Sequence, residues 1–171
     1  MDKTETTFDY NSISPGYYDE VFRKAKGPQS KWHHHKFAFV RSRLGEYQKH
    51  LDIGCGPGTF IGTLISGGRS VGVDLSGPQI VYAGDRYGGA GREFKQLNAG
   101  EPFQFADETF DKVTLIELIE HIERPQTLGL LKETRRLLKK GGRAIITTPN
   151  YASAWPLVEA VLNKVSPVSY E

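Results

Sequence analysis

The sequence predicts an α/β fold, a three-layer Rossmann-like sandwich in which helices cover both faces of a mainly parallel sheet. Three observations support this prediction. Five short segments rich in Val, Ile and Leu alternate with segments of helical periodicity. The first of these segments ends in a glycine-rich turn, and the second ends in an aspartate. In parallel sheets of this kind, ligands bind beyond the carboxyl ends of the strands, near the point where the strand order reverses.

The composition of the 171 residues suits one globular domain with a single core and excludes several classes of protein. A net charge of +2 gives no basic excess, so we do not expect a nucleic-acid partner. The single Cys55 excludes an internal disulfide and favours a reducing, cytoplasmic setting. The sequence contains no run of about 18 apolar residues, so we expect no transmembrane segment. The polar N-terminus lacks the apolar centre of a signal peptide. Nothing in the sequence indicates an oligomeric state.

The segment before the first strand divides into an arm and a helical cap. Residues 1–16 are polar and end in Ser-Pro-Gly, so we expect a mobile arm. Residues 17–46 contain two expected helices, near 17–26 and 30–44, with a Gly-Pro pair between them. One face of the second helix carries apolar side chains and one histidine: His33, Phe37, Val40 and Leu44.

Residues 47–171 form the expected main domain, in which strands and helices alternate. The expected strands are 50–54, 70–76, 93–98, 110–118 and 143–150. The expected helices between them are 59–66, a segment that begins after Ser76, and 126–139. In the last of these helices, we expect Leu128, Leu131 and Leu138 on the buried face. A final apolar stripe predicts one more helix through Val158, Val161, Leu162 and Val165.

The end of the first strand, LDIGCGPGTF, has the properties of a nucleotide-binding turn. Gly54, Gly56 and Gly58 allow a tight turn and a close approach of the backbone to a ligand. The next helix points the positive end of its dipole at that ligand. Asp74 ends the second strand, 20 residues after Gly54. A carboxylate at this place can accept hydrogen bonds from ribose hydroxyls.

Two cofactors are compatible with this turn. A dinucleotide fingerprint has its third small residue where this chain has Thr59. Asp52 precedes the first glycine by two residues, and an anion there would repel a pyrophosphate but attract a cationic amino-acid group. The charge argument therefore favours S-adenosylmethionine over NAD.

Four segments in order resemble motifs of the class I S-adenosylmethionine-dependent methyltransferases: LDIGCGPGTF, VGVDLS, FDKVTLIELIEHI and LLKKGGRAIITTPN. The resemblance covers about residues 48–150 and implies that residues 47–171 bind S-adenosylmethionine. It implies contacts of the methionine part with Gly54, Cys55 and Gly56, of the ribose with Asp74, of the adenine with Leu75, Asn98 and Ala99, and of the sulfonium with Glu117 and Leu118. With Asp52 and Gly58, these are the candidate cofactor-binding residues.

The chain departs from the family pattern at two places. Relatives often have Asp at the position of Asn98, although an amide carbonyl can also accept a hydrogen bond from adenine. The family sheet usually has seven strands, and this chain has about five. We therefore expect the C-terminal strand hairpin to be missing and residues 143–150 to form an exposed edge. We also expect such a chain to bind the cofactor but to methylate its acceptor poorly.

The stretch ELIEHI places Glu117, Glu120 and His121 on one side of a helix or tight turn. His121 follows the fourth strand, beside which the methyl group should lie, so we expect it to act as the general base for a hydroxyl acceptor. In small-RNA 2′-O-methyltransferases the same spacing supplies metal ligands. Because charge clusters are more often solvated surface, we expect no metal. Relatives often close the site with an N-terminal helix, which would bring His33 or Lys36 to the cofactor's carboxylate.

The expected function is in-line methyl transfer to an oxygen of a small molecule, a sugar or a lipid-linked acceptor. Residues 147–163 are similar to methyltransferases of polysaccharide and lipid-sugar biosynthesis and to the ubiquinone-pathway O-methyltransferases. Three alternatives stay open. They are a metal-dependent RNA 2′-O-methyltransferase, a NAD-binding oxidoreductase domain, and a domain that binds S-adenosylmethionine without catalysis.

Overall fold

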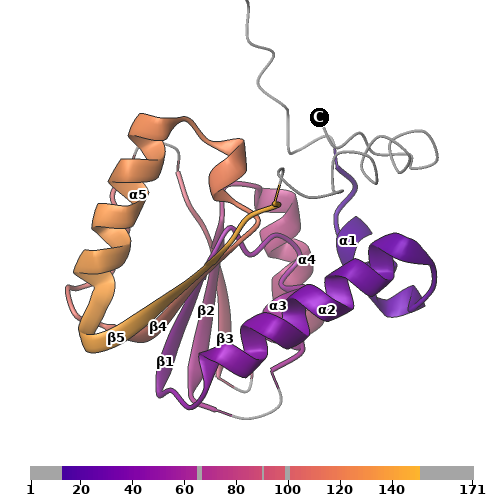
Figure 1. The fold of residues 1–171 in the computed structure, drawn as a ribbon, viewed down its shortest axis with the longest axis horizontal. Helices are drawn as coiled ribbons and strands as arrows, with labels where there is room; N and C mark the ends of the chain where they lie inside the picture. The colour runs from indigo at the N-terminus through magenta and orange to yellow at the C-terminus, as the bar shows by residue number, and fades with distance from the viewer. Residues whose placement is uncertain (1–12, 65–66, 90, 99–100, 151–171) are drawn as a thin grey trace, which may run out of the picture.

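A parallel sheet of five strands forms the centre of the protein in the computed structural model (Figure 1). The structure describes residues 13–64, 67–89, 91–98 and 101–150. The strands are β1 (Lys49–Ile53), β2 (Arg69–Asp74), β3 (Arg92–Gln96), β4 (Phe110–Ile116) and β5 (Leu138–Thr147). Their order is β3-β2-β1-β4-β5, and every neighbouring pair is parallel. The predicted fold class is confirmed, whereas the helix expected around Val158 lies outside the described residues.

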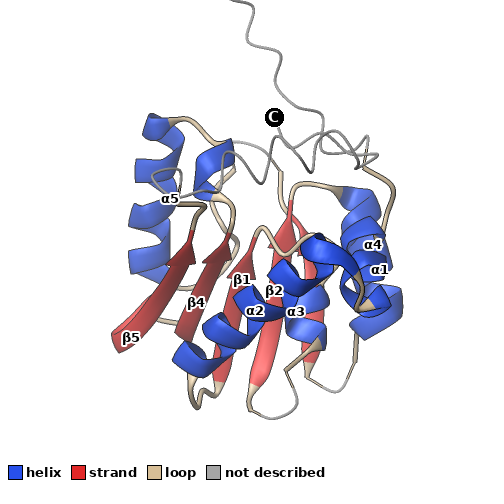
Figure 2. Cartoon of the chain, turned by 45° about the vertical axis from the view of Figure 1, so that its right-hand side comes forward, coloured by secondary structure: helices blue, strands red, loops and turns tan. Residues whose placement is uncertain are grey.

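Helices form a layer on each side of this sheet, as predicted (Figure 2). They are α1 (Tyr17–Lys24), α2 (Gly27–Leu44), α3 (Thr59–Gly62), α4 (Gly77–Tyr87) and α5 (Arg124–Leu137). The crossovers through α3 and α4 run along the sheet in one direction, and the crossover through α5 runs in the other. Because such crossovers share one handedness, α5 packs on the opposite face from α3 and α4. In the described part of the chain, no helix combines the length and the apolar character needed to cross a membrane.

Each face of the sheet has its own apolar core. On the α5 face, alternate residues of the central strands are almost fully buried: Leu51, Ile53, Val113 and Leu115, with Val73, Phe110 and Leu137. On the other face, Val40 and Leu44 of α2 pack with Phe60 of α3 and Ile145 of β5. The predicted apolar face of α2 is therefore confirmed. Burial on both faces is typical of parallel sheets and explains the nearly continuous apolar strands.

The prediction for the last crossover helix, expected at 126–139, was wrong in its bounds and in its buried face. Leu128 and Leu131 are 53% and 36% exposed, and the buried residues of α5 are Thr134 and Leu137. The helix begins early because Glu123 and Gln126 form a capping box. The helix ends before Leu138. Leu138 is the first residue of β5, and its side chain packs against the core.

The Lys-Lys-Gly-Gly stretch at residues 139–142, where the expected helix 126–139 ends, instead lies within β5. Phe110 pairs with Leu138, and the next paired residues are Lys112 and Arg143. The strand therefore carries an irregular excursion between these pairs, in which Gly141 has a φ of 78°. Such a backbone conformation suits glycine, so the two glycines serve a bulge rather than a helix terminus.

The first crossover helix is shorter than predicted over its described residues. Its helical hydrogen bonds define a single turn, Thr59–Gly62, instead of the expected 59–66, of which 65–66 lie outside the described residues. Phe60, Ile61 and Leu64 are buried as expected.

The N-terminal helices are fastened to the main domain by buried polar contacts. Asp19 of α1 is fully buried and accepts hydrogen bonds from the hydroxyls of Thr59, Tyr82 and Tyr87. Ile13, at the end of the expected mobile arm, is 7% exposed, and its carbonyl accepts a bond from Gln79. The described chain is thus packed against α3 and α4 from residue 13 onward.

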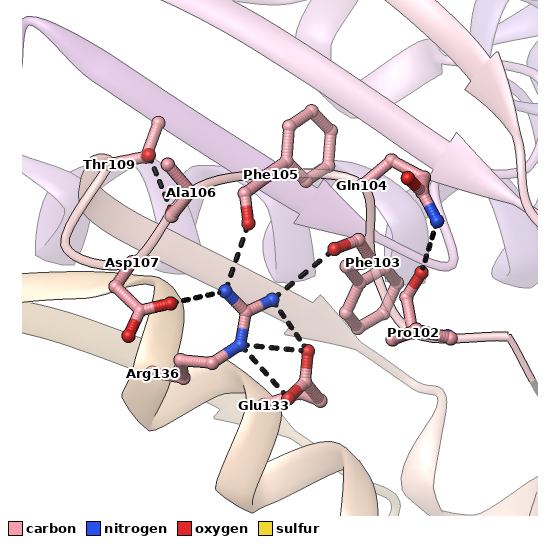
Figure 3. A network of polar contacts seen from close by, with 9 residues as sticks. All are labelled: Pro102, Phe103, Gln104, Phe105, Ala106, Asp107, Thr109, Glu133 and Arg136. Carbon is pink, nitrogen blue, oxygen red and sulfur yellow. Dashed lines mark hydrogen bonds and ion pairs between the residues drawn. The ribbon is translucent and has the colours of Figure 1, made fainter.

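An arginine on α5 fixes the loop before β4 (Figure 3). Arg136 donates to the backbone carbonyls of Phe103 and Phe105, at 3.3 and 2.9 Å. The same guanidinium binds both oxygens of Glu133 and one oxygen of Asp107. These bonds lower the pKa of Glu133. One half-buried side chain therefore ties the loop to the helix.

We expect Arg136→Met to lower the free energy of unfolding by about 1–2 kcal/mol, because charged hydrogen bonds to two carbonyls are lost. The exposed pair with Asp107 adds little. Urea denaturation measures the effect, and Arg135→Met on the same turn is the exposed control. Since the pKa of Glu133 is lowered in the folded state, its contribution is present above the ordinary pKa and disappears with falling pH. The difference between Arg136→Met and wild type should therefore shrink below about pH 4. Equal stabilities at pH 7 would contradict the assigned role.

Candidate active site

The switch in strand order lies between β1 and β4. β1 has β2 on one side and β4 on the other, and the chain leaves β1 and β4 toward opposite faces of the sheet. Ligands of such sheets bind at the carboxyl ends of the strands beside this switch. The glycine turn after β1 and the ELIEHI stretch after β4 meet at this place. The ends of β2 and β3 lie on the same edge (Figure 2).

The glycine turn is held against the end of β2 by backbone hydrogen bonds. The amides of Gly54 and Cys55 both donate to the carbonyl of Val73, at 2.8 and 3.1 Å. Asp74 accepts one bond from the amide of Gly56 at 2.8 Å and one from the amide of Ser76 at 2.9 Å. A carboxylate has about four acceptor sites, so Asp74 can still accept bonds from ligand hydroxyls.

The loops after β1 and β4 touch each other. Gly54 has a φ of 74°, and a Cβ built there would lie 3.0 Å from Leu118. At Gly56, by contrast, a Cβ would meet nothing within 4 Å, so that backbone is open to a ligand. Glu117 has a φ of 53°, and its amide donates to the carbonyl of Thr147 at 3.1 Å. A non-glycine residue in this region is strained, and such residues cluster at functional sites.

Two predicted residues beside the turn are buried. Asp52 is 2% exposed and accepts a 2.5 Å hydrogen bond from the hydroxyl of Thr114. Burial raises the pKa of Asp52 to about 7, the Thr114 hydroxyl opposes this rise, and the charge of Asp74 adds to it. Burial, with the charges of Asp52 and Asp74, raises the pKa of the Cys55 thiol. The thiol is therefore neutral and contributes packing rather than charge.

The residues predicted at the adenine end follow two adjacent strands. Asp74 pairs with Gln96, so Leu75 and Asn98 leave β2 and β3 next to each other. Leu75 is 56% exposed, so its apolar side chain is open to a ligand. The Asn98 amide donates to Glu101 at 2.9 Å. Ala99 lies outside the described residues.

The ELIEHI stretch ends β4 and forms a 3₁₀ turn, Ile119–His121. No hydrogen bond of ordinary geometry reaches the buried carboxylate oxygens of Glu120 among the described residues, although the Thr148 hydroxyl is near enough to lower its pKa. Burial outweighs this effect and raises the pKa of Glu120. Lys36 of α2 interacts with the charges of Glu117 and Glu120, and burial lowers its pKa. The N-terminal cap thus brings a cation to this end of β4.

The imidazole of His121 is more than one-third exposed at the end of the turn. Partial burial lowers its pKa, the charge of Glu117 opposes this shift, and Lys36 supports it. A lowered pKa keeps the ring neutral at pH 7, the form that can take up a proton. His33, on the predicted face of α2, has its pKa lowered to about 3, chiefly by burial, and stays neutral as well.

Among the described residues, no three His, Cys, Asp or Glu side chains are arranged to hold a metal ion. Glu117, Glu120 and His121 share a short segment without forming such a ligand set. The expectation that no metal binds stays a prediction. A surface hollow exists at the opposite end of the sheet, beside Tyr47, Asp111 and Lys139, but it contains none of the candidate site residues.

The sequence analysis missed two polar residues next to Asp52. His50 and Thr114 are fully buried in β1 and β4, and each is hydrogen-bonded to its neighbour in the sheet. A signal for His50 existed in the sequence, since His50 and Asp52 alternate with the apolar Leu51 and Ile53. Thr114 had no such signal, because threonine is common in strands.

Comparison with known proteins gives a consistent result. Residues 51–146, more than half of the chain, match a family described as a methyltransferase domain. The ubiquinone biosynthesis O-methyltransferase of Pseudomonas aeruginosa (strain LESB58) is 30% identical over 106 residues, which cover 60% of this chain and 45% of that protein. The chain therefore spans about half the length of the curated relatives that it matches first.

Solved structures resemble the chain over most of its length. PH0226 from Pyrococcus horikoshii OT3 superposes with a TM-score of 0.68 and 26% identity, over 86% of this chain and 68% of that one. A SAM-dependent methyltransferase from Archaeoglobus fulgidus superposes with a TM-score of 0.63 and 22% identity, over 90% of this chain and 69% of that one. At 22% identity, the similarity to the Archaeoglobus fulgidus protein shows only that the two folds are alike.

Proposed function

Since this chain belongs to the methyltransferase-domain family of class I S-adenosylmethionine-dependent methyltransferases, we propose that it transfers a methyl group to an oxygen atom of a small-molecule acceptor. The observation that carries the proposal is the meeting of four strand ends at the switch in strand order. The glycine turn and Asp74 come from one side, and Leu118 and His121 come from the other. The family match leaves the NAD-binding alternative without support.

The residues present fit S-adenosylmethionine. The open backbone at Gly56 leaves room for the amino-acid part, and Asp74 keeps acceptor sites for the ribose hydroxyls. The exposed Leu75 offers an apolar surface for adenine, and Asn98 lies at the neighbouring strand end. Above its raised pKa of about 7, Asp52 supplies a negative charge below the turn for the ammonium group. When bound, the cofactor supplies a methyl group that its sulfonium has already activated for in-line displacement.

His121 acts on the acceptor in this proposal. Its neutral imidazole takes up the proton that the acceptor hydroxyl loses as the oxygen bonds to the methyl carbon. Glu117 faces the same space and stabilises the imidazolium that forms. Leu118, packed on Gly54, excludes water between the two loops. Alignment and exclusion of water are the main work left to the protein, because the methyl donor is already activated.

The choice of an oxygen acceptor is supported by the neutral base and by the name of the Pseudomonas relative, an O-methyltransferase. A sugar or lipid-linked acceptor in the cytoplasm belongs to the same proposal through the resemblance of residues 147–163. No observation on the described residues favours the RNA 2′-O-methyltransferase alternative.

We expect S-adenosylhomocysteine to bind with a Kd in the micromolar range, on the order of −8 kcal/mol. Asp74→Ala should weaken binding by about 1–3 kcal/mol, because the ribose hydroxyls and the Gly56 amide lose their acceptor. Isothermal titration calorimetry measures both values, and Asp85→Ala on the exposed face of α4 is the matched control. Tight binding of NADH with no response to S-adenosylhomocysteine would overturn the proposal.

A further inference from the structure

A row of buried hydrogen bonds crosses the sheet below the glycine turn. The Tyr47 hydroxyl is 3.1 Å from Ser70, and Ser70 is 3.3 Å from Nδ1 of His50. Nε2 of His50 is 2.8 Å from the Thr114 hydroxyl, which donates to Asp52 at 2.5 Å. We call this series the polar row. It ends two residues before Gly54.

The polar row lies on one face of the sheet because its members share strand parity and register. His50 and Asp52 are two residues apart on β1, so they point to the same side. Ser70 pairs with His50, and Thr114 pairs with Asp52. These four side chains are at most 3% exposed. The apolar rings of Tyr47 and Phe60 pack against the His50 imidazole.

The proton positions along the polar row follow from the donors available. An ionised Asp52 can only accept hydrogen bonds, so the Thr114 hydroxyl donates its one proton to the bond with Asp52. Thr114 must then accept from Nε2–H of His50. Burial lowers the pKa of His50 to about 3, so the ring is neutral and its Nδ1 accepts from Ser70. Ser70 in turn accepts from Tyr47. Every hydrogen therefore points toward Asp52.

Aligned donors of this kind stabilise a negative charge at their end. A buried carboxylate needs such support, because burial disfavours its charged form. The groups that face Asp52 are the Thr114 hydroxyl from β4, the Asp74 carboxylate from β2 and the neutral Cys55 thiol from the turn. Of these, only the hydroxyl favours ionisation. Apolar residues at the positions of His50 and Thr114 could fill this face of the sheet and would leave no buried polar group to satisfy. Packing alone therefore does not require the polar row.

We infer that Thr114 and His50 are positioning residues, which hold Asp52 ionised and oriented toward the cofactor's ammonium group. Binding of the amino-acid part of the cofactor then requires an intact polar row. This inference rests on the placement of Asp52 in the proposed function. It adds a role for two residues that touch no cofactor atom themselves.

The test is the pH dependence of S-adenosylhomocysteine binding, measured by calorimetry between pH 5.5 and 7.5, where the ligand's amino group stays protonated. Wild-type affinity should fall below about pH 7, as Asp52 takes up a proton. Thr114→Val should move this fall to higher pH. A one-unit rise in the pKa of Asp52 weakens binding roughly fivefold at pH 7 and tenfold at pH 6. Thr114→Ser keeps the hydroxyl and should restore the wild-type profile.

Two comparisons make the result specific. 5′-Methylthioadenosine has the nucleoside but no amino-acid part, so Thr114→Val should leave its affinity within about twofold at every pH. His50→Leu breaks the row one link further away and should shift the fall in the same direction by less. This second variant also keeps the test valid if Thr114→Val does not fold, as circular dichroism would reveal.

The outcomes separate the inference from its premise. If Asp52→Asn weakens S-adenosylhomocysteine binding while Thr114→Val and His50→Leu keep the wild-type profile, the polar row has no positioning role. If Asp52→Asn binds as tightly as wild type at every pH, the placement of Asp52 in the proposed function is wrong. Equal losses for 5′-methylthioadenosine and S-adenosylhomocysteine would indicate damage to the fold and would also refute the inference.

Discussion

Replacement of His121 by alanine should lower the rate of methyl transfer roughly 100- to 10,000-fold, the usual contribution of a general base. The imidazole lies at the end of β4, its pKa is lowered mainly by partial burial, and it is neutral at pH 7. S-Adenosylhomocysteine binding should stay within about twofold of wild type, because His121 is not a predicted cofactor contact. The rate is measured as single turnover on a small-molecule hydroxyl acceptor with saturating cofactor. His35→Ala, an exposed histidine on α2, is the control.

The pH profile gives a second measure of this role. The active form of His121 is the neutral ring, so the rate is maintained above its pKa and falls as the pH drops through it. Because that pKa is lowered, the fall should begin below the ordinary histidine value of about 6.5. The titration of Asp52 changes the affinity for the cofactor. Saturating cofactor therefore removes its effect and leaves the fall in rate that comes from His121. A His121→Ala variant with the wild-type rate and the same acid limb would show that another group takes the proton.

Replacement of Gly58 by alanine should cost about 2–5 kcal/mol of unfolding free energy. Gly58 has a φ of 74°, a backbone conformation that costs a residue with a side chain about 1–2 kcal/mol. The new Cβ would also lie 2.7 Å from the ring of Phe94 and 2.9 Å from Ala83. Overpacking of this degree adds about 1–3 kcal/mol. Cofactor affinity should fall with stability, since Gly58 is the last glycine of the binding turn and the N-cap of α3.

Gly129→Ala is the matched control for Gly58→Ala. Gly129 lies inside α5, and a Cβ there would meet nothing within 4 Å. Alanine is a better helix former, so this variant should be more stable than wild type by about 0.5–1 kcal/mol. Urea denaturation of both variants measures the contrast. A Gly58→Ala protein as stable as Gly129→Ala would mean that the turn is far more adaptable than its contacts indicate.

Local patterns in the sequence predicted the parts of the fold that depend on neighbouring residues. The glycine turn, Asp74 and the alternation of strands and helices follow from chain spacing, and the structure brings the turn and Asp74 to one edge of the sheet. The buried face of α5 could not be predicted from these local patterns. The leucines of α5 allow two apolar stripes, and the way β5 pairs with β4 decides which stripe is buried. That pairing includes the irregular excursion between Leu138 and Arg143, for which the sequence has no clear signal.

Contacts between distant parts of the chain limited the prediction of the site in the same way. Thr114 meets His50 and Asp52 across 64 and 62 residues of sequence. A threonine in a strand gives no sign of such a partner. The approach of Lys36 to the end of β4 likewise depends on how α2 packs on the sheet. Ala99 lies outside the described residues, so its predicted adenine contact stays a prediction.

The buried Asp19 has a consequence for how the molecule opens. Its carboxylate accepts from Thr59 of α3 and from Tyr82 and Tyr87 of α4. Thr59 directly follows the last glycine of the binding turn, so α1 cannot leave without exposing that turn and removing the acceptor of three hydroxyl groups. Helix α1, the turn and the second half of α4 therefore behave as one cooperative unit of local unfolding. A ligand that stabilises the turn also stabilises the N-terminal helix, although Asp19 and Thr59 are 40 residues apart in the sequence.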